Sequence, residues 1–186
     1  MSTTNWEARL TEPVSPTRDH IRGSVNASLT LVEYGDYECP YCRAAHLVVE
    51  AILKQSGTGL RFVFRHFPLT TIHPHAEPAS EAAEAAGGQG QYYAMHDLLY
   101  ENQQRLEDRY LLGYADSLGL DLDRFGRDIA ERAYDRKIIG DFMSGVRSGV
   151  NGTPTFYIND RRHDGSWDFK ALAAAIQAAA ASAQPS

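Results

Sequence analysis

The feature that most constrains this chain is a pair of cysteines, Cys39 and Cys42, placed where the hydrophobic pattern changes its period. Before them, residues 29–34 form a short apolar run, partly β-branched, which is typical of a buried strand. After them, apolar residues between positions 45 and 53 recur with the spacing of one helix face. Residues 60–67 follow as a second strand. This strand–helix–strand order predicts two parallel strands joined by a right-handed crossover.

The rest of the sequence divides into segments of different character, and the whole predicts an α/β fold. A turn-rich arm is expected to carry an edge strand near residues 19–22. A long middle stretch is rich in Ala, Leu, Glu and Arg, with helices expected near 75–87, 90–103, 106–118, 121–131 and 133–147. The β pattern resumes at 155–159, and a last helix begins near 166–168. The predicted segments are the arm at 1–27, a βαβ half at 28–72, a helical insertion at 73–149 and a ββα half at 150–186.

Composition and charge exclude several classes of protein. The chain of 186 residues has a net charge of -6, whereas a nucleic-acid surface needs clustered Lys and Arg. Its two cysteines are too few for a disulfide framework. No apolar run reaches the length that crosses a bilayer, and the first residues do not resemble a signal peptide. If this sequence is the whole chain, we therefore expect it in the cytoplasm, away from membranes.

The spacing of the two cysteines suits thiol–disulfide exchange, in which the thiolate is the nucleophile. Cys39 falls at the predicted helix N-terminus, where unpaired N–H groups and the helix dipole favour a negative charge. Pro40 suits the first helical position. We therefore predict that Cys39 is an exposed attacking thiol with a lowered pKa. Cys42, one turn inside the helix, is predicted to be the buried resolving thiol.

Three other uses of the two cysteines would also fit the sequence. A structural disulfide would close only a tiny loop and constrain little chain. A zinc site would need two more ligands, which His73 and His75 could supply, although their spacing is not that of a zinc finger. Two inert buried cysteines would have no need of a position at a helix start. We therefore expect a redox site without metal or cofactor.

Two further positions are candidate site residues. Glu33 interrupts an apolar strand, where a carboxylate is costly unless it has a partner or a task. Because it lies near the end of the strand that leads to Cys39, it is a candidate base for the proton of Cys42; the alternative is a surface glutamate on an exposed strand face. The pair Thr153–Pro154 precedes a strand, and an X–Pro bond is the one peptide bond that readily becomes cis.

At this point the sequence resembles the DsbA-like proteins of the thioredoxin superfamily. Residues 31–42 resemble the strand and active-site turn of that family. Further blocks follow in the same order at residues 64–69, 73–76, 152–156 and 164–165.

The resemblance implies a thioredoxin fold with a helical insertion, and a cis-proline at Pro154 that faces Cys39. It also implies that Thr153 offers backbone groups to a bound peptide and that Glu33 is the buried acid of the family. We assign Pro40 and Tyr41, between the cysteines, to the substrate-binding surface. Periplasmic oxidases of the family often carry His where this chain has Tyr41.

The function expected from these features is exchange of disulfides with protein or peptide substrates, completed by a redox partner of the thioredoxin or glutathione type. The direction stays open, although a reducing cytosol favours a reductase, an isomerase or a repair enzyme. A non-catalytic peptide-binding or chaperone module could use the same cleft. A glutathione-dependent transferase is a third possibility, and it would not require the second cysteine.

Overall fold

A mixed β-sheet forms the centre of the molecule in the computed structural model, which describes residues 8–182. Its strand order is β1-β3-β2-β4-β5. The central strands β2 (Leu29–Gly35) and β3 (Leu60–His66) are parallel, as predicted. The other strands, β1 (Ile21–Arg22), β4 (Thr155–Ile158) and β5 (Arg161–His163), pair antiparallel to their neighbours. The parts of the predicted arm and last segment at residues 1–7 and 183–186 lie outside the described residues.

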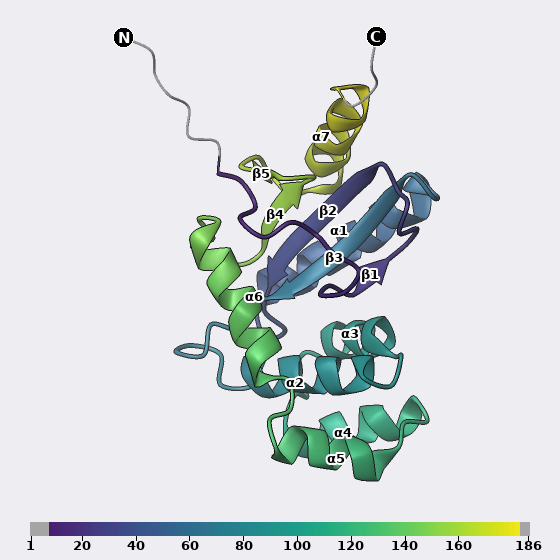
Figure 1. Cartoon of the computed structure of the whole chain (residues 1–186), viewed down its shortest axis with the longest axis vertical. Coiled ribbons are helices and arrows are strands. Elements are labelled where there is room, and N and C mark those ends of the chain that lie inside the picture. The colour runs from purple at the N-terminus through teal and green to yellow at the C-terminus, as the bar shows by residue number, and fades with distance from the viewer. Residues whose placement is uncertain (1–7, 183–186) are drawn as a thin grey trace.

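Helices cover both faces of the sheet (Figure 1). Helices α1 (Pro40–Ser56) and α7 (Phe169–Ser182) pack together on one face. Helix α6 (Asp135–Arg147) and the N-terminal arm cover the other. Four helices lie beyond one end of the sheet: α2 (Ala76–Gly87), α3 (Tyr92–Glu101), α4 (Asp108–Ser117) and α5 (Leu122–Ala130). Among the described residues, no helix combines the length and apolar character that crossing a bilayer requires.

Strand β2 is buried along its whole length, because helices or the arm cover it on both sides. Its side chains alternate between the two faces, as any strand requires. Leu29 and Leu31 join the apolar cluster beneath α1 and α7. Val32 and Tyr34 join a second cluster beneath α6. Burial on both faces explains why the sequence of this strand is a nearly continuous apolar run.

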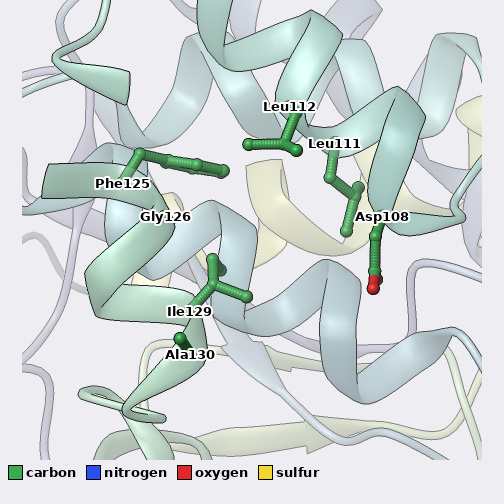
Figure 2. Close-up of a pocket in the computed structure, with 7 residues that line it drawn as sticks. All are labelled: Asp108, Leu111, Leu112, Phe125, Gly126, Ile129 and Ala130. Atoms are coloured by element: carbon green, nitrogen blue, oxygen red, sulfur yellow. The ribbon is translucent and has the colours of Figure 1, made fainter. Parts of the chain in front are cut away.

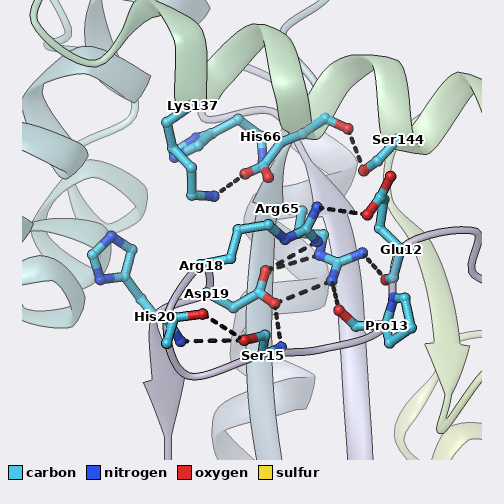
Figure 3. Close-up of polar contacts among 12 residues, drawn as sticks. Glu12, Pro13, Ser15, Arg18, Asp19, His20, Arg65, His66, Lys137 and Ser144 are labelled. Atoms are coloured by element: carbon cyan, nitrogen blue, oxygen red, sulfur yellow. Dashed lines mark hydrogen bonds and ion pairs between the residues drawn. The ribbon is translucent and has the colours of Figure 1, made fainter.

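A buried arginine attaches the arm to the second face of the sheet (Figure 3). The guanidinium of Arg65, on β3, donates to both carboxylate oxygens of Asp19 at 3.0 and 3.1 Å. It also donates to the backbone carbonyl of Glu12 at 2.9 Å and to the Tyr34 hydroxyl at 3.0 Å. Burial acts to raise the pKa of Asp19, but the bonds from Arg65 outweigh it and the pKa is lowered. The arm is therefore held by a charged contact inside the fold.

Helices α2–α5 pack around a core rich in alanine from α2. Between α4 and α5, farthest from the sheet, lies a mostly apolar pocket of about 270 Å³ (Figure 2). Its lining is Asp108, Leu111, Leu112, Phe125, Gly126, Ile129 and Ala130. The predicted helices are all present, although those at 92–101 and 108–117 are shorter at both ends than the sequence pattern indicates.

The last helix begins as predicted. The Oδ1 atom of Asp168 accepts the backbone N–H of Ala171 at 3.0 Å, which satisfies one of the unpaired donors at the start of α7. In the preceding hairpin, β5 begins at Arg161. In the turn before this strand, Asn159 takes a positive φ of 57°, a conformation that asparagine tolerates better than most residues.

Candidate active site

Cys39 and Cys42 lie at the junction of the sheet and α1, where the sequence places them. Cys39 is the residue before the helix, with extended backbone, and Pro40 opens the first turn. The backbone carbonyl of Cys39 accepts the N–H of Arg43 at 3.2 Å, the first bond of the helical ladder. Both cysteines are thiols. The helix therefore directs its unpaired N–H groups toward Cys39 and carries Cys42 into the core.

The two thiols have opposite acidities. The pKa of Cys39 is lowered to about 5, first by its hydrogen bond with Cys42, against the effect of burial, with further help from Thr153 and from the backbone N–H groups of Cys42 and Tyr41. The pKa of Cys42 is raised well above its ordinary value by burial, by its bond to Cys39 and by the negative charge of Glu33. At neutral pH one sulfur is a thiolate and the other keeps its proton.

The prediction that Cys39 is exposed is wrong, although its predicted acidity agrees with the structure. Only 4% of its surface is exposed, compared with 0% for Cys42. One reason is that the loop before β4 lies over the sulfur: the Sγ atom of Cys39 is 3.5 Å from the carbonyl oxygen of Thr153. The difference between the two thiols therefore comes from hydrogen bonding and position more than from exposure.

The loop that approaches Cys39 contains the Thr153–Pro154 peptide bond, which is cis. Both residues are partly exposed, and β4 begins directly after them at Thr155. The resemblance implied this arrangement, and the structure brings Thr153 into contact with the attacking sulfur. Tyr41 is 66% exposed on the adjacent helix start, and Pro40 is exposed beside it. The two assigned surface residues are therefore accessible next to Cys39.

Glu33 is a buried carboxylate at the centre of the sheet, 1% exposed. The alternative of a surface glutamate is therefore wrong, because both faces of β2 are covered. Its Oε1 atom has no hydrogen-bond partner among the described residues. Burial, followed by the charge of Cys39, raises the pKa of Glu33 to about 8. A carboxyl group with this pKa, close enough to influence Cys42, exchanges protons near neutral pH.

Gly35 makes room for this carboxylate. A Cβ atom added at Gly35 would lie 2.3 Å from the ring of Phe64 and 3.1 Å from Oε1 of Glu33. The approach to Phe64 is one that real Cβ atoms essentially never make, and the approach to Glu33 is tighter than most. Any larger residue at this position would displace the Phe64 ring.

Two acids that flank the turn before Cys39 are each bonded to a histidine. The Oδ2 atom of Asp36 lies 2.8 Å from Nδ1 of His73 and also accepts the backbone N–H of Leu69. The carboxylate of Glu38 accepts the backbone N–H of His75 at 2.7 Å and lies 2.9 Å from its Nδ1 atom. No pattern in the sequence indicated either contact between an acid and a histidine.

The structure does not assemble that zinc site. Within the described residues, the sets of side chains whose ligand atoms approach closely enough to hold a metal contain no cysteine; they are His46 with His96 and Asp97, and His66 with Glu84 and Asp141. The two histidines instead fasten the segment after β3 to the active-site turn.

Gln103 is a site residue that no sequence pattern indicates. Its Nε2 atom donates to the backbone carbonyls of Tyr37 and Cys39, at 2.8 and 2.9 Å. It comes from the segment after α3, 64 positions away from Cys39. Only the packing of the helical insertion against the active-site turn makes this contact.

The sequence of this chain matches a known family and is similar to part of two larger proteins. The family model for thioredoxin matches residues 15–178. The chain is 51% identical over 167 residues to the Na(+)/H(+) antiporter NhaA 1 of Salinispora arenicola, an alignment that covers 90% of this chain and 26% of the antiporter. A second antiporter, NhaA of Herminiimonas arsenicoxydans, is 42% identical over 169 residues, covering 91% of this chain and 27% of that protein. The chain spans about a quarter of the length of these curated relatives.

Solved structures share the architecture. A thioredoxin-like oxidoreductase from Silicibacter pomeroyi superimposes with a TM-score of 0.79 and 29% identity, covering 90% of this chain and 94% of that one. Oxidised BdbD from Bacillus subtilis gives 0.80 and 19%, covering 92% and 97%. α-DsbA1 from Wolbachia pipientis gives 0.80 and 20%, covering 92% and 94%. The last two likenesses establish the fold alone.

Proposed function

The chain belongs to the thioredoxin family, and from that premise we propose that it is a DsbA-like thiol–disulfide oxidoreductase that exchanges disulfides with protein or peptide substrates. The observation that carries the proposal is the contrast between its two thiols. Cys39 has a pKa lowered to about 5 at the start of a helix, and Cys42 is buried one turn later with a raised pKa. This is the arrangement that an attacking and a resolving thiol require.

In the reducing direction, the Cys39 thiolate attacks one sulfur of a substrate disulfide and forms a mixed disulfide, while the other substrate sulfur leaves as a thiolate. Cys42 then attacks the Sγ atom of Cys39. This closes the Cys39–Cys42 disulfide and releases the second substrate thiol, so two electrons pass to the substrate. The reverse sequence oxidises a substrate dithiol.

Glu33 serves the second step. Cys42 cannot attack until it loses its proton, and its raised pKa makes spontaneous loss slow. Glu33 lies close enough for its charge to affect that thiol, and its own pKa of about 8 lets it accept a proton near neutral pH and release it afterwards. We propose Glu33 as the general base for Cys42, and as the general acid when the direction is reversed.

The substrate backbone is proposed to lie along the loop at Thr153 and Pro154. This loop is partly exposed and reaches the Cys39 sulfur. Pro154 has no N–H, so the edge beside it is left free for an extended peptide that pairs with backbone groups. Tyr41, exposed on the helix start, is proposed to contact the same peptide.

The acidity of Cys39 also bears on direction. A stabilised thiolate favours the reduced dithiol and makes the disulfide more oxidising. A pKa of about 5 lies between roughly 7 for thioredoxin and roughly 3.5 for DsbA. We propose a pair that is more oxidising than thioredoxin and less oxidising than DsbA, recycled by a thiol partner of the thioredoxin or glutathione type. A redox titration of Cys39–Cys42 against glutathione tests this.

A trapping experiment tests the mechanism itself. The Cys42→Ser variant keeps the attacking thiol but lacks the resolving one, so it is expected to accumulate mixed disulfides with a disulfide-containing protein. Cys39→Ser is the matched control and is expected to trap none; both are read on non-reducing gels and by mass mapping. Equal trapping by the two variants would contradict the assigned roles. A peptide-binding module without redox chemistry would keep its affinity for the reduced substrate in both.

A further inference from the structure

A cavity of about 350 Å³ lies beside the active-site turn, on the side of the helical insertion. Glu38 and Pro40 line it from the turn, and Gln103, Gln104 and Glu107 line it from the segment between α3 and α4. Its volume falls at the low end of the range for ligand pockets, roughly 300–1,000 Å³. The redox mechanism makes no use of this space.

The charged groups around the cavity are acidic. Two of its lining residues are carboxylates, Glu38 and Glu107, two are the histidines His73 and His75, and none of the described residues that line it is Lys or Arg. Among residues 8–182, the only Lys or Arg paired with either acid is the exposed Arg109, 4.0 Å from Glu107. His75 shares the Glu38 carboxylate. A positively charged group entering from solvent therefore meets two acids, and no Lys or Arg among the described lining residues competes with it for them.

A buried side chain in the wall points to the same kind of ligand. Gln103 is only 8% exposed, and both bonds of its Nε2 atom go to backbone carbonyls of the turn, at Tyr37 and Cys39. Its side-chain oxygen accepts no hydrogen bond from the described residues, and the residue lines the cavity. An amide held in this orientation presents an acceptor, which a guanidinium or ammonium can use.

From these observations we infer that the cavity is a specificity pocket for a basic side chain, Lys or Arg, located next to the reacting cysteine of the substrate. The inference rests on the proposed disulfide exchange. A wall residue, Gln103, is bonded to the backbone of Cys39 itself, and neighbouring substrate residues are spaced by only about 3.5 Å of extended chain. Pro40 and the buried Leu106 give apolar surface for the methylene stem of such a side chain.

The test uses reduced protein and cyclic disulfide peptides that are identical except for the residue after one cysteine, which is Arg, Gln or Glu. The second-order rate constant of each peptide is divided by its rate constant with a small neutral dithiol, which removes intrinsic differences between the peptides. We expect the Arg peptide to react roughly twofold to fivefold faster than the Gln peptide, as for one partly exposed ion pair, and the Glu peptide to react more slowly.

Substitutions at exposed positions separate the pocket from the general negative charge of the protein. Gln104→Glu is expected to increase the Arg-to-Glu ratio, and Gln104→Lys to bring it to one or below. Glu107→Gln should lower it. Glu131→Gln removes the same charge at an exposed residue that does not line the cavity, and it should leave the ratio unchanged.

Each outcome decides between the alternatives. Equal rate constants for all three peptides would overturn the pocket, as would a ratio that responds to Glu131→Gln as strongly as to Glu107→Gln. Exchange would still be seen in both cases. Failure of every peptide to react would instead overturn the proposed oxidoreductase function.

Discussion

Two glutamates in this protein are equally buried and chemically opposite. Glu33, in the central strand, is 1% exposed, and Glu84, on α2, is 3% exposed. The pKa of Glu33 is raised to about 8, first by burial. Burial acts in the same direction on Glu84, yet the pKa of that group is lowered well below its usual range. Burial alone therefore does not decide whether a carboxyl group is protonated or ionised near neutral pH.

Partners account for the difference. Glu84 is bonded to His20 at 2.9 Å and to His66 at 2.8 Å, and Lys137 on α6 lies 3.9 Å from it. Oε1 of Glu33 has no partner among the described residues. Opposite charges and hydrogen bonds favour the ionised form, whereas burial without them favours the neutral form. The charged cluster around Glu84 joins α2, α6 and the end of β3. The unpartnered Glu33 is instead suited to moving a proton.

The largest expected effect is on the free energy of unfolding, and it comes from breaking the ion cluster around Glu84. Glu84→Gln leaves His20 and His66 without the carboxylate that they share, while Lys137 keeps its contact with Asp141. Because each hydrogen bond to a charged group contributes about 1.5–3 kcal/mol, we expect the variant to lose about 3–5 kcal/mol of unfolding free energy. Denaturant unfolding of the variant measures this. Because Glu84 lies on α2, away from the cysteines, the rate of disulfide exchange by the folded fraction should change little.

Glu81 supplies the matched control, three residues earlier on the same helix. It is also buried, but neither of its carboxylate oxygens has a hydrogen-bond partner among the described residues, and burial raises its pKa to about 7. Glu81→Gln should therefore leave the unfolding free energy unchanged or raise it. Equal losses in the two variants would show that partners are not the cause of the contrast.

The next largest effect is on the rate of the resolving step, and it is expected on substitution of Glu33. Glu33→Gln is expected to slow the resolving step roughly 100-fold at pH 7, because the variant cannot take the proton from Cys42. Stopped-flow measurement of decay of the mixed disulfide isolates that step. Attack by Cys39 should be much less affected, and the fold should remain intact. An unchanged rate of resolution across the pH range would leave Glu33 a structural residue.

A smaller effect appears in the pH dependence of stability. Glu33 has a pKa of about 8 when folded and an ordinary value of 4.5, so its contribution to stability is complete below pH 4.5 and is lost as the pH rises to about 8. Cys39 has a pKa of about 5 when folded and an ordinary value of 9.0, so its contribution is complete above pH 9 and is lost as the pH falls to about 5. Between these limits the two groups oppose each other.

Removing the Glu33 carboxylate reveals the pH dependence that Cys39 contributes to stability. In reduced protein, Glu33→Gln should make the unfolding free energy rise with pH more steeply than in the unaltered chain, by up to about 1.4 kcal/mol per pH unit between pH 5 and 8. Urea unfolding at several pH values measures the difference in slope. A parallel dependence in both proteins would mean that Glu33 already carries its charge throughout this range.

Local patterns in the sequence predicted most of the architecture. The alternation and apolar runs of β2, β3 and β4 located the sheet, and the period of the segment after Cys39 located α1. The helices of the insertion were also located, apart from their ends. These features depend on neighbours within a few positions, which is the information that periodicity contains.

Long-range contacts explain what the patterns could not provide. Asp36 and Glu38 precede the cysteine by only a few positions, but their histidines lie 37 positions farther along the chain. The exposure of Cys39 was wrongly predicted because the loop at Thr153, 114 positions away, lies over it. The cavity beside Pro40 depends equally on the insertion packing against the turn.

The sequence by itself determined that a dithiol stands at a strand–helix junction, and hence which two atoms can exchange electrons with a substrate. The tertiary structure alone decided the charge on the buried acids. Glu33, Glu81 and Glu84 are the same residue type at similar burial, and each acquires its pKa from groups that the fold brings near it or keeps away. Electrostatic energy depends on distances in space, and distances between remote residues exist only after the chain has folded.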